Sequence, residues 1–141
     1  LVIAHENDTK VKRLAGKIDR VLVDAPCSGL GTLRRNPDLK FRQSPESVAE
    51  LVAKQAAILK SAARLVKPGG RLVYAVCTLT RAETVEVAAK FSSDHPEFEP
   101  VPVVVAGLGE PGPGSATPAT ITLWPQDLNA NGMFIAIWKK R

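Results

Sequence analysis

Two short apolar runs, each leading to a cysteine, constrain the fold of this chain more than any other feature. The first run, Asp19–Asp24, leads through Ala25 and Pro26 to Cys27, and the second, Arg71–Cys77, ends in a cysteine itself. Short β-branched runs between polar ends are typical of strands buried on both faces of a parallel sheet. We therefore expect two buried strands with a cysteine at the carboxyl end of each.

The segment between these runs has the pattern of one long helix. Ser44 can cap its amino terminus, Pro45 suits its first turn, and Lys67–Gly70 is expected to end it. One face, with Gln55 as its polar exception, carries apolar residues at three- and four-residue steps: Val48, Leu51, Val52, Leu59, Ala62 and Val66. A strand, a helix and a strand in this order predict a right-handed parallel crossover, so the two strands should be neighbours.

The rest of the chain adds smaller elements to this unit. Thr80 and Glu83 have the spacing of a capping box, which predicts a helix that continues through Phe91. Residues 107–118 are rich in Gly and Pro and are expected to form a flexible loop. Ile121–Trp124 and Met133–Trp138 are expected to form an antiparallel pair. The fold class is thus α/β, with a terminal hairpin joined to a parallel sheet.

Composition excludes several classes of protein. A length of 141 residues with 45% hydrophobic content suits one domain, and a formal charge of +5 modestly favours a polyanionic partner. Two cysteines describe neither a disulfide-rich secreted fold nor a structural zinc site. His5 and His95 lie far apart in polar segments, so we expect solvated histidines and no metal. Without a signal peptide or an apolar membrane span, a soluble cytoplasmic protein is expected.

The carboxyl ends of neighbouring parallel strands meet at one edge of a sheet, where functional groups collect. Asp24, Cys27 and Cys77 should therefore share a crevice. A thiol in this position can be a small buried hydrophobe, a nucleophile or half of a redox pair. Strand spacing alone leaves these alternatives open.

Three strings carry a resemblance to a known family: DRVLVDAPCSGLGTLRRNPDLKF, LVKPGGRLVYAVCTLTRAE, and LWPQ followed by NGMFIAIW. From Ile18 onward the chain resembles the Fmu/Sun family of RNA cytosine-5-methyltransferases, bacterial members of which modify ribosomal RNA. The resemblance implies a partial Rossmann-like methyltransferase fold, S-adenosylmethionine as cofactor and RNA as substrate.

The resemblance also implies roles for particular residues. Carbon 5 of cytosine is a poor nucleophile, and a thiolate that adds to carbon 6 activates it. Cys77 matches that nucleophile, and Cys27 matches the second thiol implicated in release. Asp24 matches the acid that contacts the pyrimidine, and Asp24 and Pro26 are also expected to bind the cofactor. DNA cytosine-5-methyltransferases instead use a Cys in the position of Cys27 as nucleophile. Methylation of an exocyclic amine is a weaker alternative, because such enzymes usually carry an aromatic residue there.

A basic loop follows the first cysteine. It contains one aromatic residue among its cations, in the order Arg34, Arg35, Lys40, Phe41 and Arg42. These residues are expected to contact RNA phosphates and to stack on a base. The alternative is a solvated loop that Phe41 anchors to the core.

The sequence also departs from the family pattern. Val76 and Thr78 stand where family members usually have Thr and Ser, so one hydroxyl is lost. We find no strand and Gly-rich turn for the cofactor ahead of Ile18, so residues 1–141 are expected to be the carboxyl-terminal portion of a single catalytic domain, with Leu1–Ala4 as its third strand. The strand at Val21–Val23 would then be an open edge that favours self-association. A non-catalytic RNA-binding fragment is the alternative function.

Overall fold

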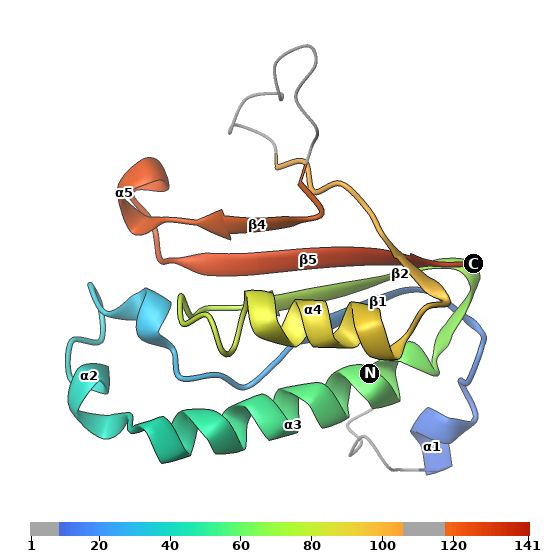
Figure 1. Ribbon diagram of the computed structural model, residues 1–141, viewed down its shortest axis with the longest axis horizontal. Coiled ribbons are helices and arrows are strands. Elements are labelled where there is room, and N and C mark those ends of the chain that lie inside the picture. The colour runs from blue at the N-terminus through green and yellow to red at the C-terminus, as the bar shows by residue number, and fades with distance from the viewer. Residues whose placement is uncertain (1–8, 106–117) are drawn as a thin grey trace.

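The computed structural model describes residues 9–105 and 118–141, which form a sheet flanked by helices (Figure 1). The predicted loop at 107–118 and the predicted strand Leu1–Ala4 lie outside the described residues, except for Pro118. The elements are, in chain order, α1 (Thr9–Lys12), β1 (Ile18–Asp24), the 3-10 turn η1 (Leu30–Thr32), α2 (Leu39–Arg42), α3 (Pro45–Ala63), β2 (Val66–Val76), α4 (Val85–Asp94), β3 (Phe98–Pro100), β4 (Thr120–Leu123), α5 (Pro125–Leu128) and β5 (Met133–Lys140).

The predicted parallel pair is confirmed. β1 and β2 run parallel, with Val21 opposite Leu72 and Asp24 opposite Ala75, and α3 connects them. β5 pairs antiparallel with β2 on one side and with β3 and β4 on the other, which confirms the predicted terminal hairpin. The turns that follow β1, together with α2 and α5, lie at one end of the sheet, opposite the carboxyl terminus (Figure 1).

The long helix begins where the sequence predicts but ends earlier. Ser44 caps α3, accepting a hydrogen bond from the amide of Ser47, and Pro45 is the first helical residue. Val66, expected on the helix, is instead the first residue of β2 and pairs with Ile18. The prediction was wrong because Lys67–Gly70 lies within the strand, where Gly69 has a positive φ of 78° and a side chain at Gly70 would meet the carbonyl of Asp19.

The core lies between the sheet and the helices α3 and α4. Trp138 and Tyr74 are its largest fully buried side chains, and the Phe91 ring packs 4.7 Å from the Trp138 ring. The indole N–H of Trp138 donates to the Ser92 hydroxyl at 2.9 Å, which satisfies its one buried donor. α4 is thereby fixed to the terminal strand β5.

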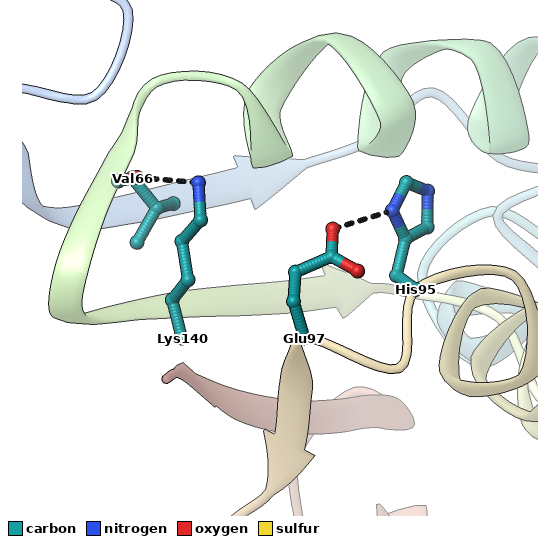
Figure 2. A network of polar contacts seen from close by, with 4 residues as sticks. All are labelled: Val66, His95, Glu97 and Lys140. Atoms are coloured by element: carbon teal, nitrogen blue, oxygen red, sulfur yellow. Dashed lines mark hydrogen bonds and ion pairs between the residues drawn. The ribbon is translucent and has the colours of Figure 1, made fainter.

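The end of the sheet opposite the cysteines is closed by polar contacts (Figure 2). The Lys140 ammonium donates to the carbonyl of Val66 at 3.0 Å, which joins the end of β5 to the start of β2. His95, expected to be solvated, is half-buried; it stacks on the Phe91 ring at 4.5 Å and lies 3.1 Å from the Glu97 carboxylate. Its place is structural, and the expectation of a surface histidine was wrong.

β1 departs from the expectation of a strand buried on both faces. Only Val23 is fully buried in it, whereas Leu22 is 67% exposed. Val21 and Val23 face the core, while Leu22 points to the opposite face, because side chains alternate along a strand. Among the described residues, β1 is an edge strand.

None of the described helices is both long enough and apolar enough to span a membrane.

Candidate active site

The two cysteines lie together at the carboxyl ends of β1 and β2. Their Sγ atoms are 3.5 Å apart, and both thiols are partly buried. The parallel register brings Asp24 opposite Ala75, and the amide of Ala25 continues the pairing with the carbonyl of Ala75 at 3.3 Å. β1 and β2 therefore end in register at the same edge of the sheet. This confirms the predicted juxtaposition of Cys27 and Cys77.

A glycine locks the turn after Cys27 against the second cysteine. The Gly31 N–H donates to the carbonyl of Cys77 at 3.0 Å, and the Gly31 carbonyl accepts from the Gly132 N–H at 2.7 Å. A Cβ at position 31 would lie 2.4 Å from the Gly132 carbonyl oxygen, closer than atoms can approach. Only glycine fits between these two backbones.

A carboxylate that the sequence did not assign to the site bonds the residues next to both thiols. The Glu83 side chain is fully buried and accepts hydrogen bonds from the amide and hydroxyl of Ser28 at 2.8 and 2.6 Å. Three further donors reach it: Thr78 at 3.0 Å, Thr80 at 2.7 Å and the Gln55 amide at 3.1 Å.

The predicted capping box was therefore wrong. Glu83 precedes α4, which begins at Val85, and its buried carboxylate accepts from the hydroxyl of Thr80 and from Ser28, instead of from the backbone N–H of Thr80 as a capping box requires. Gln55 is the polar exception on the apolar face of α3 because its amide binds the site: it donates to Glu83 and also to the Pro26 carbonyl at 3.0 Å. That single polar residue on an apolar helical face was the signal available in the sequence.

The site shifts the acidity of two groups in opposite directions. Burial, with the neighbouring Cys77, raises the pKa of Cys27 from 9.0 to about 12, so this thiol keeps its proton at neutral pH. Burial would also raise the pKa of Glu83, but hydrogen bonds from Ser28, Thr80 and Thr78 outweigh it and lower that pKa below its usual value. The site thus contains a protonated thiol beside Cys77 and an ionised carboxylate bonded to Ser28 and Thr78.

Asp24 and Pro26 lie between the end of β1 and Cys27 in the chain. Asp24 is exposed at the carboxyl end of β1, and no hydrogen bond or ion pair engages its side chain within residues 9–105 and 118–141. A free carboxylate at this edge suits an amine of a cofactor or of a base. Pro26 is also exposed, with its carbonyl held by Gln55.

The basic loop lies at the same end of the sheet and is held there by polar contacts. Arg34 donates to the Asn129 side chain at 2.9 Å, and Gln43 donates to the Ser28 carbonyl at 3.0 Å. Phe41 is 82% exposed, with the Lys40 ammonium 4.9 Å from its ring. The alternative in which Phe41 anchors the loop to the core is therefore wrong.

The other predicted loop residues are equally accessible. Arg35 is exposed, and Arg42 is exposed while paired with Asp38 one helical turn before it. Within the described part of the chain, no cluster of three or more His, Cys, Asp or Glu residues could hold a metal ion.

Comparison with known proteins places this geometry in a family. Residues 1–139 match the family model described as 16S rRNA methyltransferase RsmB/F. The chain belongs to this family. The resemblance to the Fmu/Sun methyltransferases is confirmed, and the sheet is part of a Rossmann-like methyltransferase fold.

Individual relatives of the RsmB/F family show how much of a protein this chain represents. It is 44% identical over 124 residues to a probable ribosomal RNA small subunit methyltransferase B of Synechocystis, covering 87% of this chain and 27% of the relative. A protein of the same description from Bacillus subtilis is 39% identical over 147 residues, covering 100% of this chain and 33% of the relative. The chain therefore spans about a third or less of the length of these curated relatives.

The fold agrees with a solved structure of similar sequence. NSun6 from Pyrococcus horikoshii, crystallised with SFG, superimposes with a TM-score of 0.75 at 28% identity, covering 99% of this chain and 34% of that chain.

The two departures from the pattern of the RsmB/F family differ in consequence. Thr78 replaces the usual Ser but keeps a hydroxyl, which contacts both Glu83 and the Ser28 hydroxyl. Val76 is fully buried in β2 opposite Phe134, where its methyl groups fill the core. The lost hydroxyl at position 76 leaves the network around Glu83 intact.

Proposed function

We propose that the protein containing this chain transfers a methyl group from S-adenosylmethionine to carbon 5 of a cytosine in RNA, with ribosomal RNA as the substrate class. One observation carries the proposal: two thiols 3.5 Å apart at the carboxyl ends of adjacent parallel strands. One thiol can bond to the base while the other attends its release.

In this proposal Cys77 is the nucleophile. Its thiolate adds to carbon 6 of cytosine, and the electron pair of the ring double bond becomes available at carbon 5 to take up a methyl group. S-adenosylmethionine, when bound, supplies that methyl group. Asp24, exposed and without a partner among the described residues, contacts the polar edge of the base. Loss of the carbon 5 proton to solvent then restores the double bond and expels the Cys77 sulfur.

Cys27 assists the last step. Its raised pKa keeps it a neutral thiol at physiological pH, so its S–H can hydrogen-bond the Cys77 sulfur as the bond to carbon 6 breaks. The ranking of Cys77 as nucleophile and Cys27 as assistant rests on the family resemblance.

The comparisons support the class of reaction. The relatives are described as ribosomal RNA methyltransferases, and NSun6 was crystallised with SFG, an analogue of S-adenosylmethionine. Asp24 and Pro26 would line the cofactor site, with further contacts from the longer protein. Residues 1–141 would be the carboxyl-terminal portion of one catalytic domain, acting in the cytoplasm.

The basic loop would hold the RNA. Its cations and its aromatic ring are exposed and follow Cys27 in the chain: Arg34, Arg35, Lys40, Phe41 and Arg42. An exposed ring with a cation over its face is suited to stack on an unpaired base, while the arginines neutralise phosphates.

Trapping of the covalent adduct tests the proposal. In the full-length protein, RNA containing 5-fluorocytosine blocks loss of the group at carbon 5, so the enzyme should stay attached to the RNA. We expect adduct with the wild type and Cys27→Ala, and none with Cys77→Ala. Adduct with Cys77→Ala but not with Cys27→Ala would reassign the nucleophile. RNA binding without adduct or methylation in any variant would favour the non-catalytic alternative.

The distance between the thiols also favours a second candidate, a redox pair. A separation of 3.5 Å is within reach of disulfide formation after a small movement. Reversible oxidation of Cys27 and Cys77 in a protein that never forms an RNA adduct would support that function instead.

A further inference from the structure

We propose that Glu83 is the positioning residue that sets the separation of Cys27 and Cys77. The inference rests on the proposed function for its catalytic meaning, but its geometric content concerns this chain alone. One buried carboxylate binds the residue that follows each cysteine, Ser28 and Thr78, and so joins the two turns that carry the thiols.

The turn after Cys27 is held twice. The Ser28 amide donates to one Glu83 oxygen at 2.8 Å, and the Ser28 hydroxyl donates to the other at 2.6 Å. A bidentate contact of this kind fixes both the position and the orientation of Ser28. Because Ser28 is covalently next to Cys27, the backbone of that cysteine is fixed as well.

The turn after Cys77 meets the same carboxylate. The Thr78 hydroxyl lies 3.0 Å from the oxygen that Ser28 also contacts, and the two hydroxyl oxygens are 2.8 Å apart. Ser28 and Thr78 directly follow Cys27 and Cys77, so both pairs are 50 residues apart in sequence. In each turn, the residue after the cysteine supplies the hydroxyl that contacts Glu83.

Glu83 is itself held by contacts from two other elements. Its backbone carbonyl accepts from the Tyr74 hydroxyl at 2.8 Å, within the core beneath β2. Its carboxylate accepts from Gln55 of α3, which also holds the Pro26 carbonyl immediately before Cys27. The carboxylate therefore holds both turns that carry the thiols in a defined position relative to each other.

The chemistry of the group argues against a purely space-filling role. Burying an anion is costly, and no cationic side chain pairs with Glu83 among the described residues. Five donors offset that cost, and four of them come from the turns that follow the cysteines or from Gln55, which holds the turn before Cys27. An apolar residue could fill the space, but it could not gather these groups.

The test uses the full-length protein with Glu83→Gln, which keeps the size of the side chain but turns one acceptor oxygen into a donor. Glu86→Gln is the control, since Glu86 is exposed in the first turn of α4. We expect Glu83→Gln to slow methylation about 10- to 100-fold in kcat, because small misplacements of reacting groups have effects of that size, with the RNA KM within about twofold. Glu86→Gln should match the wild type.

A second readout measures the thiol separation directly. Treatment with diamide, a mild thiol oxidant, should convert Cys27 and Cys77 to a disulfide in the wild type and in Glu86→Gln, as measured by peptide mass spectrometry. In Glu83→Gln the rate should fall at least about fivefold, because oxidation needs the sulfurs in contact. If no RNA adduct forms in any variant while this rate still depends on Glu83, the proposed function fails and the positioning role stands.

Thr78 offers a matched pair of variants in case Glu83→Gln does not fold. Thr78→Ser keeps the hydroxyl and should retain both rates, whereas Thr78→Val keeps the shape but loses the hydroxyl and should lower both. Unchanged kcat and unchanged oxidation rate in a folded Glu83→Gln, or in Thr78→Val, would overturn the inference.

Discussion

The backbone N–H of Gly31 donates a hydrogen bond to the carbonyl oxygen of Cys77, at 3.0 Å, across two turns that are far apart in the sequence. The same glycine accepts from Gly132, so one residue joins the turn after β1, the turn after β2 and the start of β5. The candidate active site is therefore held both by backbone contacts of Gly31 and by the hydrogen bonds of the Glu83 carboxylate.

Gly31→Ala should destabilise the chain and misplace Cys77. The added methyl group would lie 2.4 Å from a backbone oxygen that cannot rotate away. We expect a loss of roughly 1–3 kcal/mol in the free energy of unfolding, measured by urea titration. Gly132→Ala is the comparison, because its added carbon would meet only the flexible Leu79 side chain at 3.0 Å. Equal stability of Gly31→Ala and the wild type would contradict the proposed close packing.

The raised pKa of Cys27 predicts how stability depends on alkaline pH. The folded state holds this proton up to a pKa of about 12, whereas the unfolded thiol releases it near 9.0. The corresponding stability is fully present below pH 9 and is lost as pH rises from 9 towards 12. Unfolding titrations of wild type and Cys27→Ala should therefore converge over this range.

Alkylation provides an independent check on that thiol. At pH 9, iodoacetamide should modify Cys27 at least about tenfold more slowly in the folded chain than in urea, because only the thiolate reacts. Equal rates in the two states would show that the folded thiol ionises normally.

Phe41→Ala and Arg34→Ala should weaken RNA binding, and Arg34→Ala should also lose the exposed hydrogen bond to Asn129. Loss of one stacked base costs about 1–3 kcal/mol, so Phe41→Ala should lower affinity roughly 5- to 150-fold. Arg34→Ala should make the slope of log affinity against log salt concentration shallower by about the amount that one phosphate contact contributes. Lys54→Ala, at an exposed position on α3, is the control for the loss of a cation. Filter binding at several salt concentrations measures both effects, and a result identical to the control would remove these residues from the interface.

The exposed edge strand predicts self-association of the isolated 141-residue chain. β1 has one unpaired edge within the described part of the sheet, with Leu22 exposed beside it. Sedimentation should show concentration-dependent dimers or larger species. Leu22→Lys should shift the chain towards monomer, while Val104→Lys, at a position that is 64% exposed elsewhere, should not. A monomeric wild type at high concentration would refute the prediction.

Local pattern was enough to predict the elements that carry the thiols. Alternating and β-branched residues specify strands, and the Ser44-Pro45 pair specifies the start of α3, because these signals act over a few neighbouring residues. A helix between two such strands then makes them parallel neighbours. Cys27 and Cys77 could thus be placed at one edge before any coordinates were considered. Their ranking as nucleophile and assistant came from the family resemblance.

Tertiary structure decided what the sequence pattern could not. Glu83 has the spacing of a capping box with Thr80. Its carboxylate is buried instead, where it accepts a hydrogen bond from the hydroxyl of Ser28, 55 residues earlier. The exposure of Leu22 depends on which strands pair with β1, and the need for glycine at position 31 depends on the distant backbone of Gly132. Periodicity reports only local preference, whereas hydrogen bonds between distant turns form only after the sheet brings them together.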